Sequence, residues 1–242
     1  MKNNSIKHAW DVDPKEAKKI QEALRASLKA VPLPKDIRFV AGADVSFNKF
    51  EKDVYAGIIV LSYPDLLPIE YAVVKTEADF PYIPGYLSFR EIPPLMQCWN
   101  LLKNKPDLVV VDGHGIAHPR RLGIAAHFGL VTDTPTMGAA KNLLYGTYEA
   151  PPALAGGASS ITDPKTGETI GTALRTKNKV KEMLISPGHL NTVEDALAMA
   201  RTLVRKHRLP EPTRLAHNLV NAFRKGEIGG GYHKYSEEKS LF

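Results

Sequence analysis

Leu108-Val109-Val110-Val111-Asp112-Gly113-His114-Gly115 is the stretch that decides the fold of this 242-residue chain. Four apolar residues, three of them β-branched, run directly into a carboxylate and a Gly-X-Gly sequence. A short, continuous apolar run of this kind is typical of a strand buried on both faces of a sheet. Asp112 then lies where the strand leaves the core, at the edge where open α/β sheets bind ligands. The sequence therefore predicts an α/β protein in which Asp112 either belongs to a ligand site or caps a turn.

The chain before this stretch predicts one helix followed by three strands. The helix begins at Pro14, with Asp13 as its cap, and ends near Ala30. Strands are expected over residues 38–47, 54–61 and 69–75, and their short connections predict an antiparallel meander. Asp44 is an acidic residue inside the otherwise apolar first strand. A buried carboxylate needs a partner, so Asp44 is either a salt-bridged structural residue or a metal ligand.

A proline-rich loop follows the meander. Pro81, Tyr82, Ile83 and Pro84 form a stiff segment that regular helix or sheet does not accommodate. The large apolar groups here either plug the underside of the sheet, as favoured for Leu87 and Phe89, or protrude as a rigid Tyr-Ile wedge. The loop is expected to run to Pro93-Pro94, where a helix begins that ends before Pro106.

The second half of the chain predicts an alternation of helices and strands around a low-complexity loop. Helices are expected over residues 124–130, 193–206 and 212–225, a short strand over 136–139, a surface loop over 150–160, and a late hairpin over 168–175 and 182–186. Beyond Gly229 the glycine-rich sequence predicts a flexible tail. The expected organisation is one catalytic domain over residues 1–228 and a tail over 229–242.

Composition limits the classes of protein that fit. The net charge of +6 and the isoelectric point near 9.2 permit a nucleic-acid or phosphate partner without requiring one. The single Cys98 excludes an internal disulfide framework, and its helical context predicts a buried, unreactive thiol. No targeting segment and no membrane-spanning apolar run is found, so a cytoplasmic protein without a membrane partner is expected.

Three carboxylates stand out as candidates for chemistry: Asp44, Glu91 and Asp112. They are distant in sequence, but they converge if the first and fourth strands are neighbours in the sheet. Hard divalent cations such as Mg²⁺ take carboxylate oxygens as ligands, and a site of this kind supports hydrolysis of a phosphodiester. The spacing alone leaves a structural role open for each acid.

Several longer motifs carry a resemblance to a known family. They are Pro81-Tyr82-Ile83-Pro84-Gly85, Phe89-Arg90-Glu91, Val111-Asp112-Gly113-His114-Gly115, His118-Pro119-Arg120-Arg121-Leu122-Gly123 and Pro210-Glu211-Pro212-Thr213-Arg214. In this order, and from about Trp10 to Phe223, the chain resembles the endonuclease V family, the deoxyinosine 3′ endonucleases. The resemblance implies a ribonuclease H-like fold, with a mixed central β-sheet flanked by helices.

The resemblance also implies roles for individual residues. Asp44, Glu91 and Asp112 match the metal-site acids, and His217 matches the catalytic histidine of the last helix. Tyr82, with Pro81, Ile83 and Pro84, matches a wedge that opens the duplex beside the lesion. Residues expected to surround the pocket for the flipped base are Leu87, Gly113, Gly115, Gly123 and Gly138. Residues expected to contact the nucleic-acid backbone are His118, Arg120, Arg121 and Lys141, although Arg120, Arg121 and Lys141, each taken singly, fit a solvated surface charge better.

By this resemblance the chain is expected to be a Mg²⁺-dependent endonuclease, with Mn²⁺ as an alternative cofactor. It would recognise deaminated adenine in DNA and cut the second phosphodiester bond 3′ to it, leaving 3′-hydroxyl and 5′-phosphate ends. An enzyme of this kind must read the altered base outside the stack. The alternatives are an endoribonuclease specific for inosine and a non-catalytic nucleic-acid-binding module of the same fold. A monomer is expected, with inosine-containing DNA, or RNA, as its partner.

Overall fold

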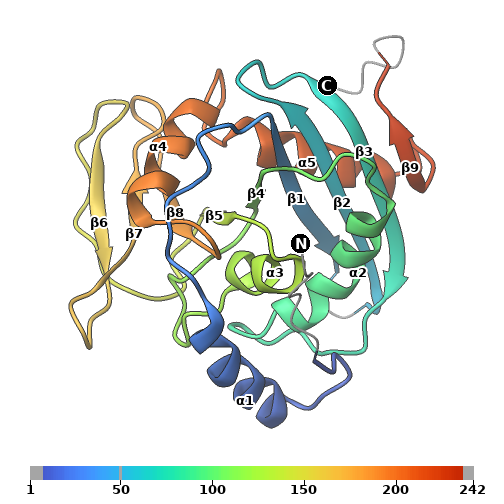
Figure 1. The fold of residues 1–242 in the computed structure, drawn as a ribbon, viewed down its shortest axis with the longest axis horizontal. Helices are drawn as coiled ribbons and strands as arrows, with labels where there is room; N and C mark the ends of the chain where they lie inside the picture. The colour runs from blue at the N-terminus through green and yellow to red at the C-terminus, as the bar shows by residue number, and fades with distance from the viewer. Residues whose placement is uncertain (1–7, 49–50, 237–242) are drawn as a thin grey trace.

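The computed structural model describes residues 8–48 and 51–236, which form a mixed α/β structure around one nine-stranded sheet (Figure 1). The strand order is β6-β7-β8-β5-β4-β1-β2-β3-β9. The strands are β1 (Phe39–Phe47), β2 (Asp53–Ser62), β3 (Pro68–Glu77), β4 (Leu108–Val111), β5 (Thr136–Ala140), β6 (Ala158–Thr162), β7 (Thr169–Leu174), β8 (Met183–Pro187) and β9 (Gly231–Lys234). The helices are α1 (Pro14–Leu24), α2 (Ser88–Leu101), α3 (Ile124–Thr132), α4 (Val193–Leu203) and α5 (Glu211–Arg224), with a 3₁₀ turn η1 (Arg25–Ser27) after α1.

The centre of the sheet combines the predicted meander with parallel strands. β1 pairs antiparallel with β2, and β2 with β3, which confirms the meander. On its other side β1 pairs parallel with β4, and β4 pairs parallel with β5. β1 and β4 are therefore direct neighbours, and their carboxyl ends meet at one edge of the sheet.

Helices cover both faces of the central strands. On one face, α4 and α5 pack against side chains such as Val40 and Val110. On the other face, α2 and α3 pack against the alternate residues, among them Ala41 and Val109. β4 is buried on both sides, as its apolar run predicts. Cys98 is buried in the core on the α2 and α3 side, as predicted, and burial raises the pKa of its thiol to about 12.

The start of α2 differs from the prediction. The helix begins at Ser88 and contains Pro93 and Pro94, which were expected to open it. Prolines at these positions each remove one backbone hydrogen bond in the first turns. Burial of Phe89 and Ile92, at 2% and 0% exposure, offsets that loss. As a result Glu91 is held in the first turn of a helix and not in a loop.

Two strands were missed by the sequence reading. Residues 158–160, expected in a surface loop, belong to β6, an edge strand in which only Ile161 is buried. β9 lies in the predicted flexible tail, where it pairs antiparallel with β3, so that prediction is wrong for residues 231–234. Tyr232 at this edge also donates its hydroxyl to the buried Glu70, at 3.1 Å. The last six residues of the tail, 237–242, lie outside the described residues.

The remaining boundaries differ by a few residues. α1 ends at Leu24 and α4 at Leu203, earlier than expected. α1 begins with the predicted cap, Asp13 accepting from the Glu16 amide, and α4 begins with Thr192 accepting from the Asp195 amide. Among the described helices, none combines the length and the apolar character needed to cross a membrane.

Candidate functional site

The candidate site lies at the carboxyl edge of β1 and β4. The parallel register sets Ala43 beside Val111, so the next residues of the two strands, Asp44 and Asp112, are neighbours. The Asp112 amide donates to the Ala43 carbonyl at 3.1 Å, which extends the pairing by one residue. The first and fourth strands are therefore neighbours, which was the condition for Asp44 and Asp112 to lie close together.

His217 reaches the same point from α5. Its Nδ1 lies 2.9 Å from Asp44 Oδ2, and its Nε2 lies 3.0 Å from Asn221 Nδ2. The hydrogen bond to Asp44 raises the pKa of His217. Potential ligand atoms of Asp44, Asp112 and His217 all lie within 4.8 Å of one another. The histidine is thus placed to act in catalysis or to bind a metal itself.

Lys141 completes the group from the end of β5. Its Nζ forms an ion pair with Asp112 Oδ2 at 2.5 Å. Burial, followed by the nearby Asp44, raises the pKa of Asp112, and Lys141 acts against that rise. In this structure Lys141 therefore neutralises a carboxylate of the site.

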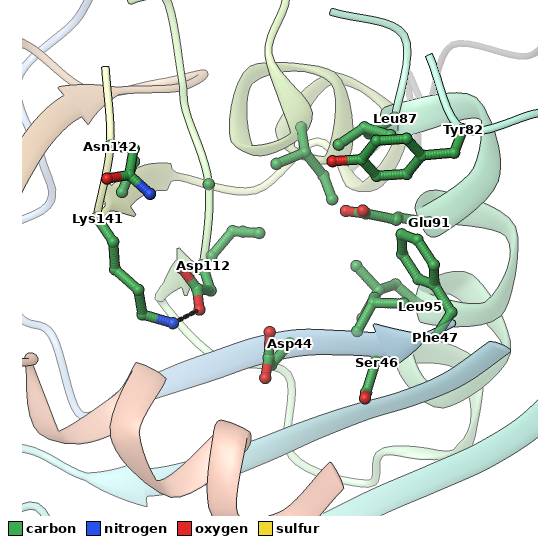
Figure 2. A pocket seen from close by; sticks show the side chains of 15 residues that line it. Asp44, Ser46, Phe47, Tyr82, Leu87, Glu91, Leu95, Asp112, Lys141 and Asn142 are labelled. Atoms are coloured by element: carbon green, nitrogen blue, oxygen red, sulfur yellow. Dashed lines mark hydrogen bonds and ion pairs between the residues drawn. The ribbon is translucent and has the colours of Figure 1, made fainter. Parts of the chain in front are cut away.

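Glu91 lines the same cavity as Asp44 and Asp112 but is not a member of the close group (Figure 2). Burial, together with the two aspartates, raises its pKa to about 8. Three carboxylates thus face one cavity together with Lys141 and His217. A set of carboxylate oxygens that converge in this way fits a hard divalent cation, which favours the ionised form of each acid.

Two adjoining cavities are present at the site. The one that contains the acids has a volume of about 470 Å³. The other has a volume of about 270 Å³ and is lined largely by the proline loop and the segment after β4. Both include Tyr82 and Leu87, and Figure 2 shows these side chains above Glu91. Tyr82 is 37% exposed, and its ring centroid lies 5.8 Å from that of Phe47 at the end of β1.

The predicted base-pocket glycines fall into two groups. Gly113 and Gly123 line the smaller cavity together with Leu87. Gly115 and Gly138 do not line it. A Cβ on Gly115 would lie 1.9 Å from the Pro187 carbonyl oxygen, and a Cβ on Gly138 would lie 2.3 Å from that of Gly113. Both glycines are needed where backbone segments pack closely behind the cavity wall.

The residues predicted to contact the nucleic-acid backbone also have different environments. Arg121 is 6% exposed and pairs with Asp163 at 2.6 Å and Glu168 at 2.7 Å, so its assignment to a phosphate contact is wrong. Arg120 donates to the Gly85 carbonyl at 2.7 Å, and its guanidinium lies 4.1 Å from the centre of the Tyr86 ring. In this structure Arg120 therefore anchors the proline loop.

His118 lines the smaller cavity as a buried, neutral ring. Its Nε2 lies 2.9 Å from the Gly85 carbonyl oxygen, and burial lowers its pKa to about 4.

Sequence reasoning missed part of the smaller cavity. His114 lines it, and its Nε2 lies 2.9 Å from the Asn142 carbonyl oxygen, which ties the loop after β4 to the segment after β5. Leu143 and Leu144 line the same cavity and are 42% and 39% exposed. The pair of leucines that begins two residues after Lys141 was the signal in the sequence that could have identified this part of the cavity.

Comparison with known proteins gives one consistent family. The family model described as Endonuclease V matches residues 21–218. An endonuclease V of Gloeobacter violaceus is 47% identical over 221 residues, covering 90% of this chain and 89% of the relative. The crystal structure of endonuclease V from Streptomyces avermitilis superposes with a TM-score of 0.84 at 36% identity and covers 93% of this chain and 100% of its own. A Ciona intestinalis endonuclease V, solved in complex with DNA containing an inosine followed by a ribo-adenosine, has a TM-score of 0.78 at 27% identity and covers 88% of this chain and 98% of its own.

Proposed function

The chain belongs to the endonuclease V family, and on this premise we propose that it is a divalent-cation-dependent endonuclease for DNA that contains hypoxanthine. It cuts the second phosphodiester bond 3′ to the lesion and leaves 3′-hydroxyl and 5′-phosphate ends. The fold assigned with this proposal is ribonuclease H-like, in a single catalytic domain that acts as a monomer.

The observation that carries the proposal is the group formed by Asp44, Asp112 and His217, whose potential ligand atoms lie within 4.8 Å of one another. The group opens directly onto a second cavity of about 270 Å³ that is large enough for an extruded base. The Ciona relative, which shares the fold, is bound to inosine-containing DNA. A cation site beside a base-sized cavity is the arrangement that a lesion-directed nuclease requires.

Asp44 and Asp112 would hold the cation, and Glu91 would join them directly or through water. Mg²⁺, or Mn²⁺ in its place, supplies charge stabilisation at the phosphate and lowers the pKa of a bound water. His217 is oriented by Asp44 at its Nδ1, which leaves Nε2, beside Asn221, to exchange a proton with water or with the leaving oxygen. Lys141, which pairs with Asp112, would contact a phosphate of the substrate.

The smaller cavity would hold the extruded hypoxanthine. Gly113 and Gly123 have no side chain, so a base in the cavity could approach the backbone there, and Leu87 would form an apolar side of the cavity. Tyr82, on the exposed rim between Pro81 and Pro84, would fill the space that the base leaves in the stack. Extrusion costs less for a weakened hypoxanthine pair than for a normal pair, which adds to selectivity.

The test is cleavage of an end-labelled duplex with one central inosine, with Mg²⁺, with Mn²⁺ and with EDTA. Wild type is expected to cut only the inosine strand, at the second bond 3′ to the lesion, and only with a divalent cation. Asp44→Ala and Asp112→Ala are each expected to abolish cleavage while retaining most of the binding, and Glu91→Ala to reduce cleavage severely. Asp65→Ala, an exposed acid in the turn between β2 and β3, is the matched control.

Cleavage by either aspartate variant at a rate near that of wild type would remove the assignment of the cation site. A matched duplex that carries the inosine in an RNA strand decides the substrate. Faster cleavage of RNA than of DNA would replace the DNA proposal with the endoribonuclease alternative.

A further inference from the structure

The positive charge of the chain is concentrated in two short stretches. Residues 175–182 contain four Lys or Arg and one acid, and residues 201–208 contain four Lys or Arg and no acid. Together they carry a net charge of +7, which leaves 24 basic against 25 acidic residues, a net charge of −1, in the rest of the chain. The overall charge of +6 therefore rests on these two stretches, of which the second extends to the turn between β2 and β3, where Arg205 donates to the Pro64 carbonyl at 2.9 Å.

The first stretch lies at the same edge of the sheet as the candidate site. β8 pairs antiparallel with β5, and the register sets Leu184 beside Ala140, the residue before Lys141. The turn between β7 and β8 therefore emerges next to the acids. A direct contact confirms the adjacency, because Lys181 Nζ donates to Asn142 Oδ1 at 3.1 Å, and Asn142 lines both cavities.

The second basic stretch is fastened to the first through the backbone. Arg208 donates from Nε to the Lys181 carbonyl at 2.7 Å and from Nη2 to the Glu182 carbonyl at 2.8 Å. We use the name basic rim for Lys177, Lys179, Lys181 and Arg208. Lys179 and Lys181 are exposed, while Lys177 and Arg208 are partly exposed.

Acids near the basic rim are already neutralised by other residues. Glu182 pairs with Arg175 at 2.9 Å and accepts the Tyr148 hydroxyl at 2.8 Å. Glu211, at the start of α5, pairs with Arg214 at 2.6 Å. Over the described residues, no carboxylate forms an ion pair with any member of the basic rim. The charge of the rim is therefore available to a ligand.

We propose that the basic rim binds backbone phosphates of the nucleic acid whose scissile bond lies at the acidic group. The inference rests on the proposed function and adds to it the surface that holds the substrate next to the cut. A phosphodiester chain is the fitting partner, because Lys181 contacts Asn142, which lines the cavity that contains the acids. Contacts of this kind position the duplex and do not read the base.

The experiment compares the affinity of Lys179→Ala/Lys181→Ala, Arg208→Ala and wild type for a labelled duplex, measured in EDTA over a series of salt concentrations. The duplex is used with one central inosine and with adenine in its place. Lys165→Ala is the matched control, since Lys165 is an exposed lysine in the turn at the opposite end of β7. Thermal melting of each variant excludes a loss of fold.

The double variant is expected to weaken binding to both duplexes equally, by on the order of eightfold per lost contact at 0.1 M salt, and to reduce the salt slope by about two. Arg208→Ala is expected to reduce the slope by about one, and Lys165→Ala to leave it unchanged. Affinity and slope equal to those of Lys165→Ala would overturn the proposal. A loss confined to the inosine duplex would also overturn it, because the rim would then read the lesion. If wild type binds both duplexes but does not cut the inosine strand, the proposed function fails while the rim is still tested.

Discussion

Gly42 offers the sharpest test of how the fold holds the candidate site. It lies in β1, two residues before Asp44, and faces the start of α5. A Cβ at this position would lie 1.8 Å from the Pro212 carbonyl oxygen and 2.2 Å from the carbonyl carbon. Both sides of the contact are backbone, so no change of rotamer relieves it. His217 follows Pro212 by five residues on the same helix, so this contact sets the distance between His217 and Asp44.

The size of the effect follows from the distances. Real Cβ contacts essentially never fall below 3.0 Å, so in Gly42→Ala the gap of 1.8 Å must lengthen by at least about 1.2 Å. If α5 moves as a unit, the hydrogen bond of 2.9 Å between His217 and Asp44 opens to about 4.1 Å and is lost. Overpacking of this kind costs about 1–3 kcal/mol, which for a chain of this size lowers Tm by roughly 2–12 °C. A displacement of about 1 Å at a catalytic group reduces the rate by on the order of a hundredfold.

The assay combines Tm with the single-turnover rate on the inosine duplex. Gly229→Ala is the matched control, because a Cβ there meets no atom within 4 Å. A double-mutant cycle with His217→Ala separates displacement of the histidine from a general loss of fold. If Gly42→Ala acts through His217, the double variant is no slower than His217→Ala alone. Losses that multiply, or a Gly42→Ala variant with the Tm and rate of the control, would refute the coupling.

Four further outcomes are expected. Tyr82→Ala should lose more single-turnover rate on inosine paired in a duplex than on inosine in a single strand, by a stacking contribution of roughly 1–3 kcal/mol; equal losses would contradict the wedge. Arg121→Ala leaves Asp163 buried and without its cation, so urea denaturation should show a loss of about 3–5 kcal/mol, and unchanged stability with weakened DNA binding would restore the phosphate contact. Burial lowers the pKa of His118 to about 4, so between pH 4 and 6.5 this residue binds fewer protons in the folded than in the unfolded chain. The free energy of unfolding therefore decreases as the pH decreases through that window, by about 2 kcal/mol from pH 7 to pH 5. His118→Gln should remove this part of the pH dependence. Addition of Mg²⁺ should raise the Tm of wild type but not of Asp112→Ala, because a ligand of the folded state alone stabilises it; equal Tm shifts would place the cation elsewhere.

Runs of apolar residues in the sequence predicted the central strands of the sheet correctly. The apolar run before Asp112 is buried on both faces as β4, and the otherwise apolar stretch around Asp44 is β1. β6 was missed because an edge strand with one buried residue, Ile161, carries almost no hydrophobic signal. β9 was missed because the run of glycines before it predicts flexibility, while its pairing with β3 depends on a strand more than 150 residues away.

The candidate site was predictable in its acids and not in its cations. An acid inside an apolar strand is conspicuous in any sequence, and Asp44 and Asp112 meet the expectation of proximity. Arg120 and Arg121 are adjacent and chemically identical, yet one anchors the proline loop and the other is buried against Asp163. The two arginines differ in their partners, which come from distant parts of the chain and are brought near only by the tertiary fold. Arg121 also has a positive φ of 61°, so its side chain leaves the backbone in a different direction from that of Arg120.

Side chains and backbone contacts around the cavity hold the three facing carboxylates in place. Burial, followed by repulsion from Asp44 and Asp112, raises the pKa of Glu91 to about 8, and that repulsion opposes the closed arrangement. The contacts that hold the acids in place against this repulsion involve Arg90, Lys141 and Gly42. The buried Arg90 donates to the carbonyls of Ala78, at 3.0 Å, and Phe80, at 2.9 Å, which fixes the first turn of α2 and with it Glu91. Lys141 fixes Asp112 from β5, and the backbone contact at Gly42 fixes α5. Each acid is therefore held on a different element, Asp44 in β1, Glu91 in α2 and Asp112 at the end of β4, so repulsion within the group is resisted by the packing of all three elements.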